Sequence, residues 1–349
     1  MTARRRTPTG THRRHRTLAT AVVVFTLGVA ACGGKDGDAT RPTQTAQPES
    51  RAVPTQASAP ATLPTRLAAD SQKTSATWSD EQVSPSQGPV TYEEAEDVFR
   101  QGDYGRAAHL FERYVVRKPD NEWGHYMLGI ASWKAGDHDA AERALKGVLQ
   151  IDPDNVKALT NLGRVLLEEG RPGDAKPHLE HAVELAPESD AAWRVLGNIQ
   201  SELGEVDVAT ESYKHALVLN DKDVWSMNNL GLLMIQSGAW DDAVKPLARA
   251  VELKPESPVF QNDLGIALER QGYTAAAAMA YRTAVGADST YEKANVSLAR
   301  VEPLIGDARP DEVDLVALAR TFERDLGVWK DAATTLAAND ANEVDQVKH

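Results

Sequence analysis

The sequence predicts an all-α fold in which about six two-helix units stack into a solenoid, because two residue ladders share one 34-residue period. Glycines recur at this spacing, at Gly102, Gly136, Gly170, Gly204, Gly238 and Gly272. Alanines recur five residues after each glycine, at Ala107, Ala141, Ala175, Ala209, Ala243 and Ala277. Leu159, Leu162 and Leu166 show the helical spacing of the apolar residues between the ladders.

The residues at the ladder positions predict that each unit consists of two helices joined by a turn. The ladder glycine ends the first helix, because glycine enters the left-handed cap conformation at little cost. Asp137, Asp174 and Asp241 lie close to the start of the second helix, where negative charge is favourable. The alanine ladder and a second glycine ladder, from Gly129 to Gly265, place small side chains where two helices cross.

These features resemble the tetratricopeptide repeat family over residues 88–291. The resemblance implies a right-handed superhelix of antiparallel helix pairs with a concave groove, and we assign six repeats to residues 90–291. We expect residues 292–330 to form C-terminal capping helices, the last of which opens at Pro310 and carries Leu315, Phe322 and Leu326. Residues 331–349 are small, polar and acidic, and are expected to form a flexible tail.

The first 31 residues have the pattern of a signal peptide, with a basic region followed by the apolar run Leu18 to Ala31. The run ends in Val29-Ala30-Ala31-Cys32, which resembles the lipobox of bacterial lipoproteins. That resemblance implies cleavage before Cys32 and lipidation of its thiol. The alternatives are an uncleaved signal anchor and a secreted protein with a chance cysteine. Cys32 is the only cysteine, and lipidation explains a leftover thiol in an exported chain.

Residues 32–89 follow as a tether rich in proline, threonine and alanine, a composition that cannot bury enough apolar surface to order itself. Residues 1–89 contain 11 Lys/Arg and 6 Asp/Glu, so residues 90–349 account for a net charge of −18 within a total of −13. Nucleic acid is not an expected partner, because phosphate contacts need clustered basic side chains.

The sequence contains no nucleophile elbow, Walker loop or dinucleotide fingerprint. We therefore predict no catalytic residues and no cofactor, and a protein that is not an enzyme. His178 and His181 lie three residues apart on one helix face. A zinc site would need two further ligands nearby, so no metal site is predicted.

The family resemblance implies that extended peptides bind along the first helices, at positions two, five, six, nine, twelve and thirteen of each repeat. The candidate groove residues are Trp123, Tyr126, Ile130, Trp133, Asn161, Arg164, Arg194, Asn198, Trp225, Asn228, Asn229 and Asn262. One end of this set is aromatic and the other carries amides. Asparagine is an indifferent helix former, so its recurrence suggests pairing with a peptide backbone. The alternatives are that the aromatic residues belong to the core and that the amides satisfy buried groups between repeats.

Part of the carboxylate clamp of chaperone-binding family members is matched by Arg194, Asn198 and Asn229. Val259 and Asp263 stand where that clamp needs basic residues. The complete clamp is therefore not expected, which leaves a single carboxylate at Arg194, with or without Arg164, as the hypothesis.

The favoured function is a non-catalytic, lipid-anchored scaffold of the bacterial cell envelope that binds envelope proteins or extended peptides and supports the assembly of envelope complexes. The rival is a lipoprotein that guides a polysaccharide or glycan during export or assembly, with the aromatic end stacking on sugars. The lipid on Cys32 would hold the protein at the inner or the outer membrane; the sequence does not choose between them. End helices can pair in this family, which leaves a homodimer open.

Overall fold

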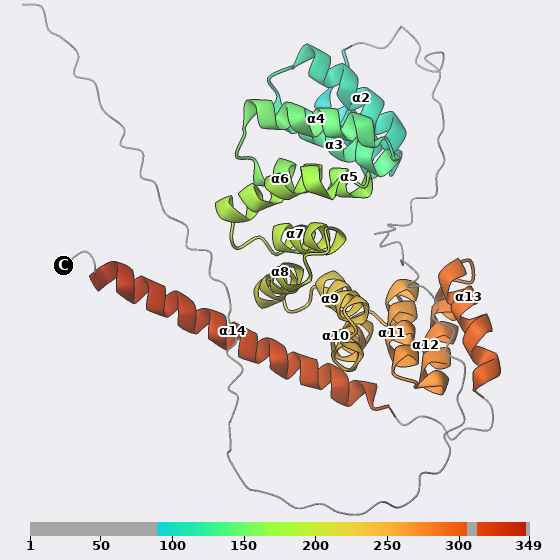
Figure 1. Cartoon of the computed structure of the whole chain (residues 1–349). Helices are drawn as coiled ribbons and strands as arrows, with labels where there is room; N and C mark the ends of the chain where they lie inside the picture. Colours follow the sequence, from blue (N-terminus) through green and yellow to red (C-terminus); the bar gives the residue numbers. More distant parts are fainter. Residues whose placement is uncertain (1–88, 306–312, 347–349) are drawn as a thin grey trace, which may run out of the picture. The chain divides into compact units, whose positions relative to one another are not determined.

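The computed structural model describes residues 89–305 and 313–346, and these residues form helices and no strand (Figure 1). The first helices of the repeats are α1 (Tyr92–Arg100), α3 (Glu122–Ala135), α5 (Val156–Glu168), α7 (Asp190–Glu202), α9 (Val224–Gln236), α11 (Pro258–Arg270) and α13 (Glu292–Val301). The second helices are α2 (Tyr104–Arg117), α4 (His138–Ile151), α6 (Pro172–Leu185), α8 (Val206–Leu219), α10 (Trp240–Leu253) and α12 (Thr274–Ala287). A 3-10 turn (Glu302–Leu304) and α14 (Leu315–Gln346) complete the chain, so the predicted all-α fold is confirmed.

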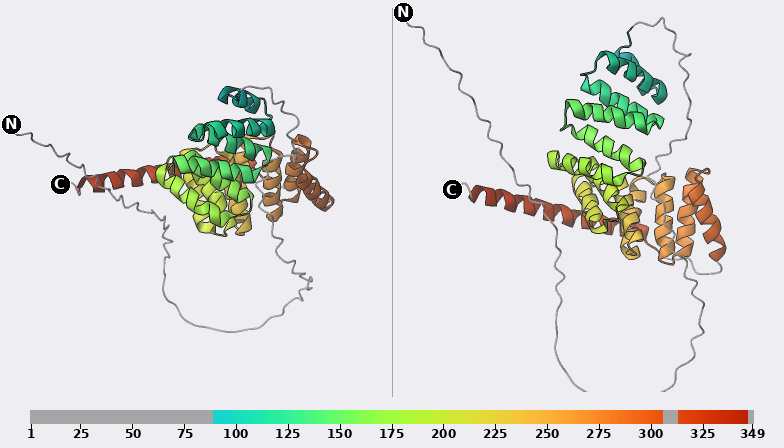
Figure 2. Two further views of the ribbon diagram at one scale, coloured as in Figure 1. Left: turned by 90° about the horizontal axis from the view of Figure 1, so that it is seen from above. Right: turned by 45° about the horizontal axis from the view of Figure 1, so that its top comes forward.

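The helix pairs stack one after another in chain order (Figure 2). From α1 to α12, each helix packs on the next one in the chain, and neighbouring first helices also contact one another, for example α3 with α5 and α5 with α7. Among the described residues, neighbouring second helices, such as α4 and α6, do not make extensive contacts with one another. The stack therefore bends toward the first helices, which places the residues of α3, α5, α7, α9 and α11 along its concave side.

The helix ends follow the sequence ladders. All six ladder glycines have left-handed backbone conformations, with φ between 73° and 86°, which confirms their predicted role as helix stops. The Asp137 carboxylate caps α4 by accepting a hydrogen bond from the backbone N–H of Ala140 at 2.9 Å. Asp174 and Asp241 lie in the first turns of α6 and α10, where negative charge is favourable.

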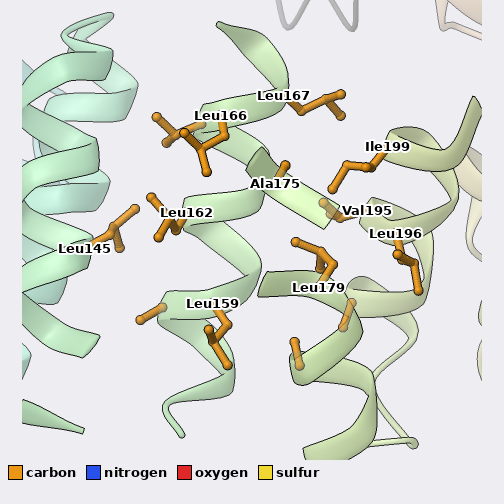
Figure 3. Close-up of a cluster of buried hydrophobic side chains, with 14 of the residues drawn as sticks. Leu145, Leu159, Leu162, Leu166, Leu167, Ala175, Leu179, Val195, Leu196 and Ile199 are labelled. Atoms are coloured by element: carbon orange, nitrogen blue, oxygen red, sulfur yellow. The ribbon is translucent and has the colours of Figure 1, made fainter. Parts of the chain in front are cut away.

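The core is continuous between neighbouring repeats. In repeats two to four, buried side chains from α4, α5, α6 and α7 point toward one another, among them Leu145, Leu162, Leu179 and Ile199 (Figure 3). Gly163 lies against Leu179, and a Cβ atom added to this glycine would stand 1.8 Å from Leu179 Cδ2. Small residues are therefore required at these crossings, as the ladders predict.

The last helix begins later and ends later than the sequence predicts. The predicted start at Pro310 lies outside the described residues, and α14 begins at Leu315, where the Asp314 side chain accepts a hydrogen bond from the backbone N–H of Ala317 at 2.9 Å. The helix then continues to Gln346 through most of the predicted tail. Alanines such as Ala332 and Ala333 favour this extension, because alanine is the best helix former.

The structure also places α14 along the side of the stack, whereas a capping helix is expected at its end. This helix packs against α10 and α8, on the side of the stack that the second helices form (Figure 1). Its buried residues Phe322 and Leu326 join the core cluster that contains Tyr213 and Leu217 of α8. The apolar face of α14 and its charged partners determine where this helix packs. The repeat pattern does not predict that position.

The predicted signal peptide (1–31), Cys32 and nearly all of the tether lie outside the described residues. Within the part of the chain that the structure describes, no helix combines the length and the apolar character needed to cross a membrane.

Candidate peptide-binding groove

The aromatic end of the predicted groove is built on α3. Trp123 is 48% exposed and stacks on Tyr126, with ring centroids 5.0 Å apart and planes inclined by 19°. One helical turn further along, Ile130 is half-buried, and the indole N–H of Trp133 donates to the Glu168 carboxylate at 2.8 Å. Fixed rings with exposed area are the kind of surface that binds an extended chain at low entropic cost.

Three cations lie among these rings. Lys157 Nζ is 5.7 Å from the ring centroid of Trp123, and Lys134 Nζ is 5.8 Å from that of Trp133. The guanidinium carbon of Arg164 also lies over Trp133, at 5.2 Å. These are cation–π contacts, each worth about 0.5–2 kcal/mol. Within the described residues none of the three cations has a carboxylate at ion-pair distance.

Asn161 connects the two halves of this arrangement. Its side-chain oxygen accepts a hydrogen bond from Arg164 at 3.0 Å, and its amide nitrogen donates to the Tyr126 hydroxyl oxygen at 3.1 Å and to the Lys157 carbonyl at 2.9 Å. The amide of Asn161 is therefore already in use, and this residue positions its neighbours. Burial lowers the pKa of Arg164, and the positive charge of Arg194 lowers it further; burial raises the pKa of Tyr126.

The amide end differs from the prediction, because its side chains bond to one another. The Asn198 side-chain oxygen is buried and accepts hydrogen bonds from the Tyr213 hydroxyl at 2.9 Å and from the Asn229 amide at 2.8 Å. The pocket beside these residues has a volume of about 20 Å³, room for a single water. The predicted alternative, that asparagines join neighbouring repeats, describes this end better than a peptide-binding role does.

Asn228 and Asn262 are also enclosed rather than facing a groove. They are 1% and 2% exposed, and their amide nitrogens donate to the two oxygens of the Asp263 carboxylate at 2.9 Å and 3.1 Å. Burial raises the pKa of Asp263, and these two hydrogen bonds oppose the shift. The acidic side chain that interrupts the clamp pattern is therefore a link between α9 and α11.

Arg194 is the other predicted carboxylate ligand, and the chain already supplies its carboxylate. Its guanidinium donates to the buried Asp223 side chain at 2.7 Å, and the Ser226 hydroxyl donates to the same oxygen at 2.6 Å. Trp225 remains 39% exposed and meets Phe260 edge to face, with centroids 4.9 Å apart. Arg194 is therefore already paired with Asp223, whereas Arg164 has no carboxylate partner among the described residues and remains able to pair with a bound anion.

Lys134 and Lys157 are absent from the groove residues predicted from the sequence. Both stand at groove positions of the repeat register, thirteen in repeat two and two in repeat three, so the signal was present. Glu168 also stands at a groove position, thirteen in repeat three, but its role as acceptor of the Trp133 indole N–H, 35 residues earlier in the chain, is visible only in the structure.

Acidic and histidine side chains do not gather into a metal-binding group of three or more anywhere in the described residues. The Nε2 atom of His181 lies 2.9 Å from an Asp154 carboxylate oxygen, in a pair at the surface. Burial lowers the pKa of its neighbour His178.

Comparison with known proteins agrees with the repeat architecture. The model of the family described as Cilia and flagella-associated protein 70 C-terminal domain matches residues 59–309. The structure is similar to PilW, a widely conserved type IV pilus biogenesis factor, at 18% identity and a TM-score of 0.54, covering 59% of this chain and 96% of PilW. It is also similar to a chain of the APC/C hetero-tetramer Cut9–Hcn1, at 15% identity and a TM-score of 0.54, covering 59% and 41% of the two chains.

A third similar structure is TTC0263, a thermophilic TPR protein of Thermus thermophilus, at 22% identity and a TM-score of 0.47, covering 52% of this chain and 99% of that one. At these identities, PilW and the Cut9–Hcn1 chain show that the fold is shared. The comparison with curated proteins gives no match.

Proposed function

Because this chain belongs to the tetratricopeptide-repeat family of the Cilia and flagella-associated protein 70 C-terminal domain, we propose that it is a non-catalytic scaffold that holds an extended segment of a partner protein along α3 and α5. The observation that carries the proposal is the exposed, fixed aromatic surface of Trp123 and Tyr126 on the inner face. Asn198 and Asn228, which the sequence predicts as groove residues, instead form hydrogen bonds with Asn229 and Asp263 of the next repeat.

The rival role, guidance of a glycan, depends on sugar rings stacking on open aromatic faces. The ring of Trp133 already lies under two cations, Lys134 and Arg164. A sugar would have to displace one of them in order to stack there. The contacts therefore favour a partner that offers hydrogen-bond acceptors and apolar side chains over one that offers sugar faces.

We further propose that the scaffold works at the bacterial envelope and is held there by lipid on Cys32. This placement is supported by the sequence Val29-Ala30-Ala31-Cys32 at the end of an apolar run and by the absence of any other cysteine in the chain. The composition of residues 32–89 supports a tether that lets the repeats reach partners away from the bilayer.

Replacing Cys32 by serine is expected to stop lipid attachment and to leave the precursor unprocessed, because the hydroxyl does not take the place of the thiol in the modification. The variant should migrate as the longer precursor and lack the mass of the acyl chains, measured by gel mobility, membrane fractionation and intact mass. Gly37→Ser, which adds a hydroxyl five residues later, should behave as the wild type. Identical mass and fractionation for Cys32→Ser and the wild type would contradict lipid anchoring.

Trp123→Ala combined with Tyr126→Ala is expected to abolish capture of partner proteins by crosslinking in intact envelopes. The double variant removes most of the exposed ring area of α3, and truncation of aromatic anchors typically costs about 2 kcal/mol or more, about 30-fold in affinity. Quantitative mass spectrometry of the crosslinked species measures the loss.

The control for this experiment is Trp240→Ala. Trp240 is 41% exposed, but it lies on the second helix α10, away from the inner face. The same proteins should be captured as by the wild type. If the double variant captures them too, partners bind elsewhere and the proposed groove is wrong.

A further inference from the structure

The inner face of repeats two and three carries three cations that form no ion pair within the described residues, although the carboxylate of Glu168, which accepts from the Trp133 indole on the same face, opposes the lowering of the Arg164 pKa by burial. We call this surface the aromatic–cation strip and define it by Trp123, Tyr126, Trp133, Lys134, Lys157 and Arg164. Carboxylates are abundant in the described chain, and exposed cations elsewhere, such as Lys146 and Arg282, pair with them. The three cations of the strip contact aromatic rings instead.

Arg164 lies at the centre of the strip and is held in place before any ligand arrives. Its guanidinium lies over Trp133 and donates one hydrogen bond to Asn161, and the structure shows no acceptor for its other N–H groups among the described residues. Asn161 also fixes the Tyr126 hydroxyl by donating to its oxygen, which leaves the hydroxyl hydrogen available. Two organised donors, Arg164 and Tyr126, therefore flank one position on the inner face.

We propose that the aromatic–cation strip recognises an acidic, extended peptide segment, with one side-chain carboxylate bound between Arg164 and Tyr126. The inference rests on the proposed function, since it names the chemistry of the partner that the groove holds. A carboxylate suits this position because a guanidinium can donate two parallel hydrogen bonds to it. Lys134 and Lys157, which lie over the rings of Trp133 and Trp123, offer charge to further acidic residues of the same segment.

The positive charge of the strip favours an acidic peptide, although the protein as a whole is acidic. The net charge of −18 over residues 90–349 is spread along the repeats, and salt screens it beyond about 8–10 Å. An ion bound at Arg164 therefore responds mainly to the local charges, which are the three cations of the strip and the Glu168 carboxylate. Burial lowers the pKa of Arg164, and Glu168 opposes this shift only from beyond ion-pair distance; a bound carboxylate would relieve the remaining cost.

The site differs from the carboxylate clamp considered in the sequence. The clamp would use Arg194 and basic residues at positions 259 and 263, where Val259 and Asp263 stand. Arg194 is bound to Asp223, and Asp263 is bound to two amides. The proposed carboxylate site therefore lies one repeat earlier and uses Arg164 together with an aromatic hydroxyl.

The test compares two eight-residue peptides with blocked termini and a neutral fluorescent label, one alternating glutamate with leucine and one alternating glutamine with leucine. Adjacent first helices lie about 10 Å apart, and an extended chain advances about 3.3 Å per residue, so eight residues cover the strip. Binding to the full chain is measured by fluorescence anisotropy. We expect the glutamate peptide to bind roughly 10- to 100-fold more tightly than the glutamine peptide.

Arg164→Met is expected to remove this preference, while Arg143→Met, at an exposed position on α4, should keep it. Tyr126→Phe provides a second, milder change that keeps the ring stack with Trp123 and removes the hydroxyl, which is both the proposed donor to the carboxylate and the acceptor of the Asn161 amide. It should weaken the glutamate peptide by about 5-fold and leave the glutamine peptide nearly unchanged. Melting curves of each variant show whether the fold is retained.

The outcomes separate the two proposals. Equal binding of both peptides, or a preference that survives both Arg164→Met and Tyr126→Phe, overturns the carboxylate site and leaves groove binding intact. Failure of both peptides to bind at millimolar concentration overturns the groove function together with the inference. Tighter binding of an eight-residue thymidine oligonucleotide than of the glutamate peptide also overturns the inference, because phosphate would then be the preferred anion.

Discussion

Replacing Phe322 by alanine is expected to detach α14 from the repeats while the repeats stay folded. Phe322 is 2% exposed, lies in the core cluster with residues of α8 and α9, and meets Trp329 edge to face at 5.7 Å. Truncating a buried phenylalanine typically costs about 3–5 kcal/mol. Since solenoid stability is a sum of local terms, α14 and the surface of α8 and α10 that it covers should lose stability, and the distant repeats should not.

Hydrogen exchange measures this release directly. A loss of about 3–5 kcal/mol lowers the protection of α14 amides by roughly two to four orders of magnitude. Peptides from α3 and α5 should keep their protection. Val328→Ala is the matched control, because Val328 is 66% exposed on the same helix and should change protection little. A uniform loss of protection through all repeats would show instead that α14 is part of one cooperative unit.

The position of α14 marks where sequence reasoning ends for the fold. The ladders identify every repeat helix, because each unit repeats the same local demands for glycine stops and small crossing residues. The position of α14 on the repeats depends on residue pairs that do not follow the 34-residue spacing, such as Arg249 with Glu323 and Lys330 with Asp221. These partners lie 74 and 109 residues apart in the chain, so an amphipathic helix is predictable and its docking surface is not.

The candidate groove shows a similar limit. The repeat register assigns residues to the inner face, but it does not tell which side chains bind one another. Tyr126 with Asn161, Trp133 with Glu168, and Asn228 with the carboxylate of Asp263 are each 35 residues apart, close to one repeat. Polar pairs at this spacing are the feature that would have distinguished bonds between repeats from free groove residues. The helix propensity of asparagine alone suggests a role without identifying it.

The glycine at position eight of repeats two to six has a packing role that is strongest at Gly163. A Cβ atom at this position would come within 1.8 Å of Leu179 Cδ2, and Leu179 is fully buried in the core between α5 and α7. Real Cβ atoms do not approach other atoms so closely, so either Leu179 leaves its rotamer or α5 and α6 separate. Both responses disturb side chains that are packed at the density of a crystal.

Gly163→Ala is therefore expected to lower the free energy of unfolding by about 1–3 kcal/mol, even though alanine is the better helix former by roughly 1 kcal/mol. Thermal and urea unfolding of the full chain measure the change. Gly173→Ala is the matched control, because a Cβ at this position in α6 meets nothing within 4 Å and the substitution should stabilise the protein slightly. The double variant Gly163→Ala with Leu179→Ala should recover part of the loss if the clash with Leu179 is its cause. If Gly163→Ala is as stable as Gly173→Ala, the crossing of α5 and α6 tolerates a wider separation, and the glycine ladder is not a packing requirement.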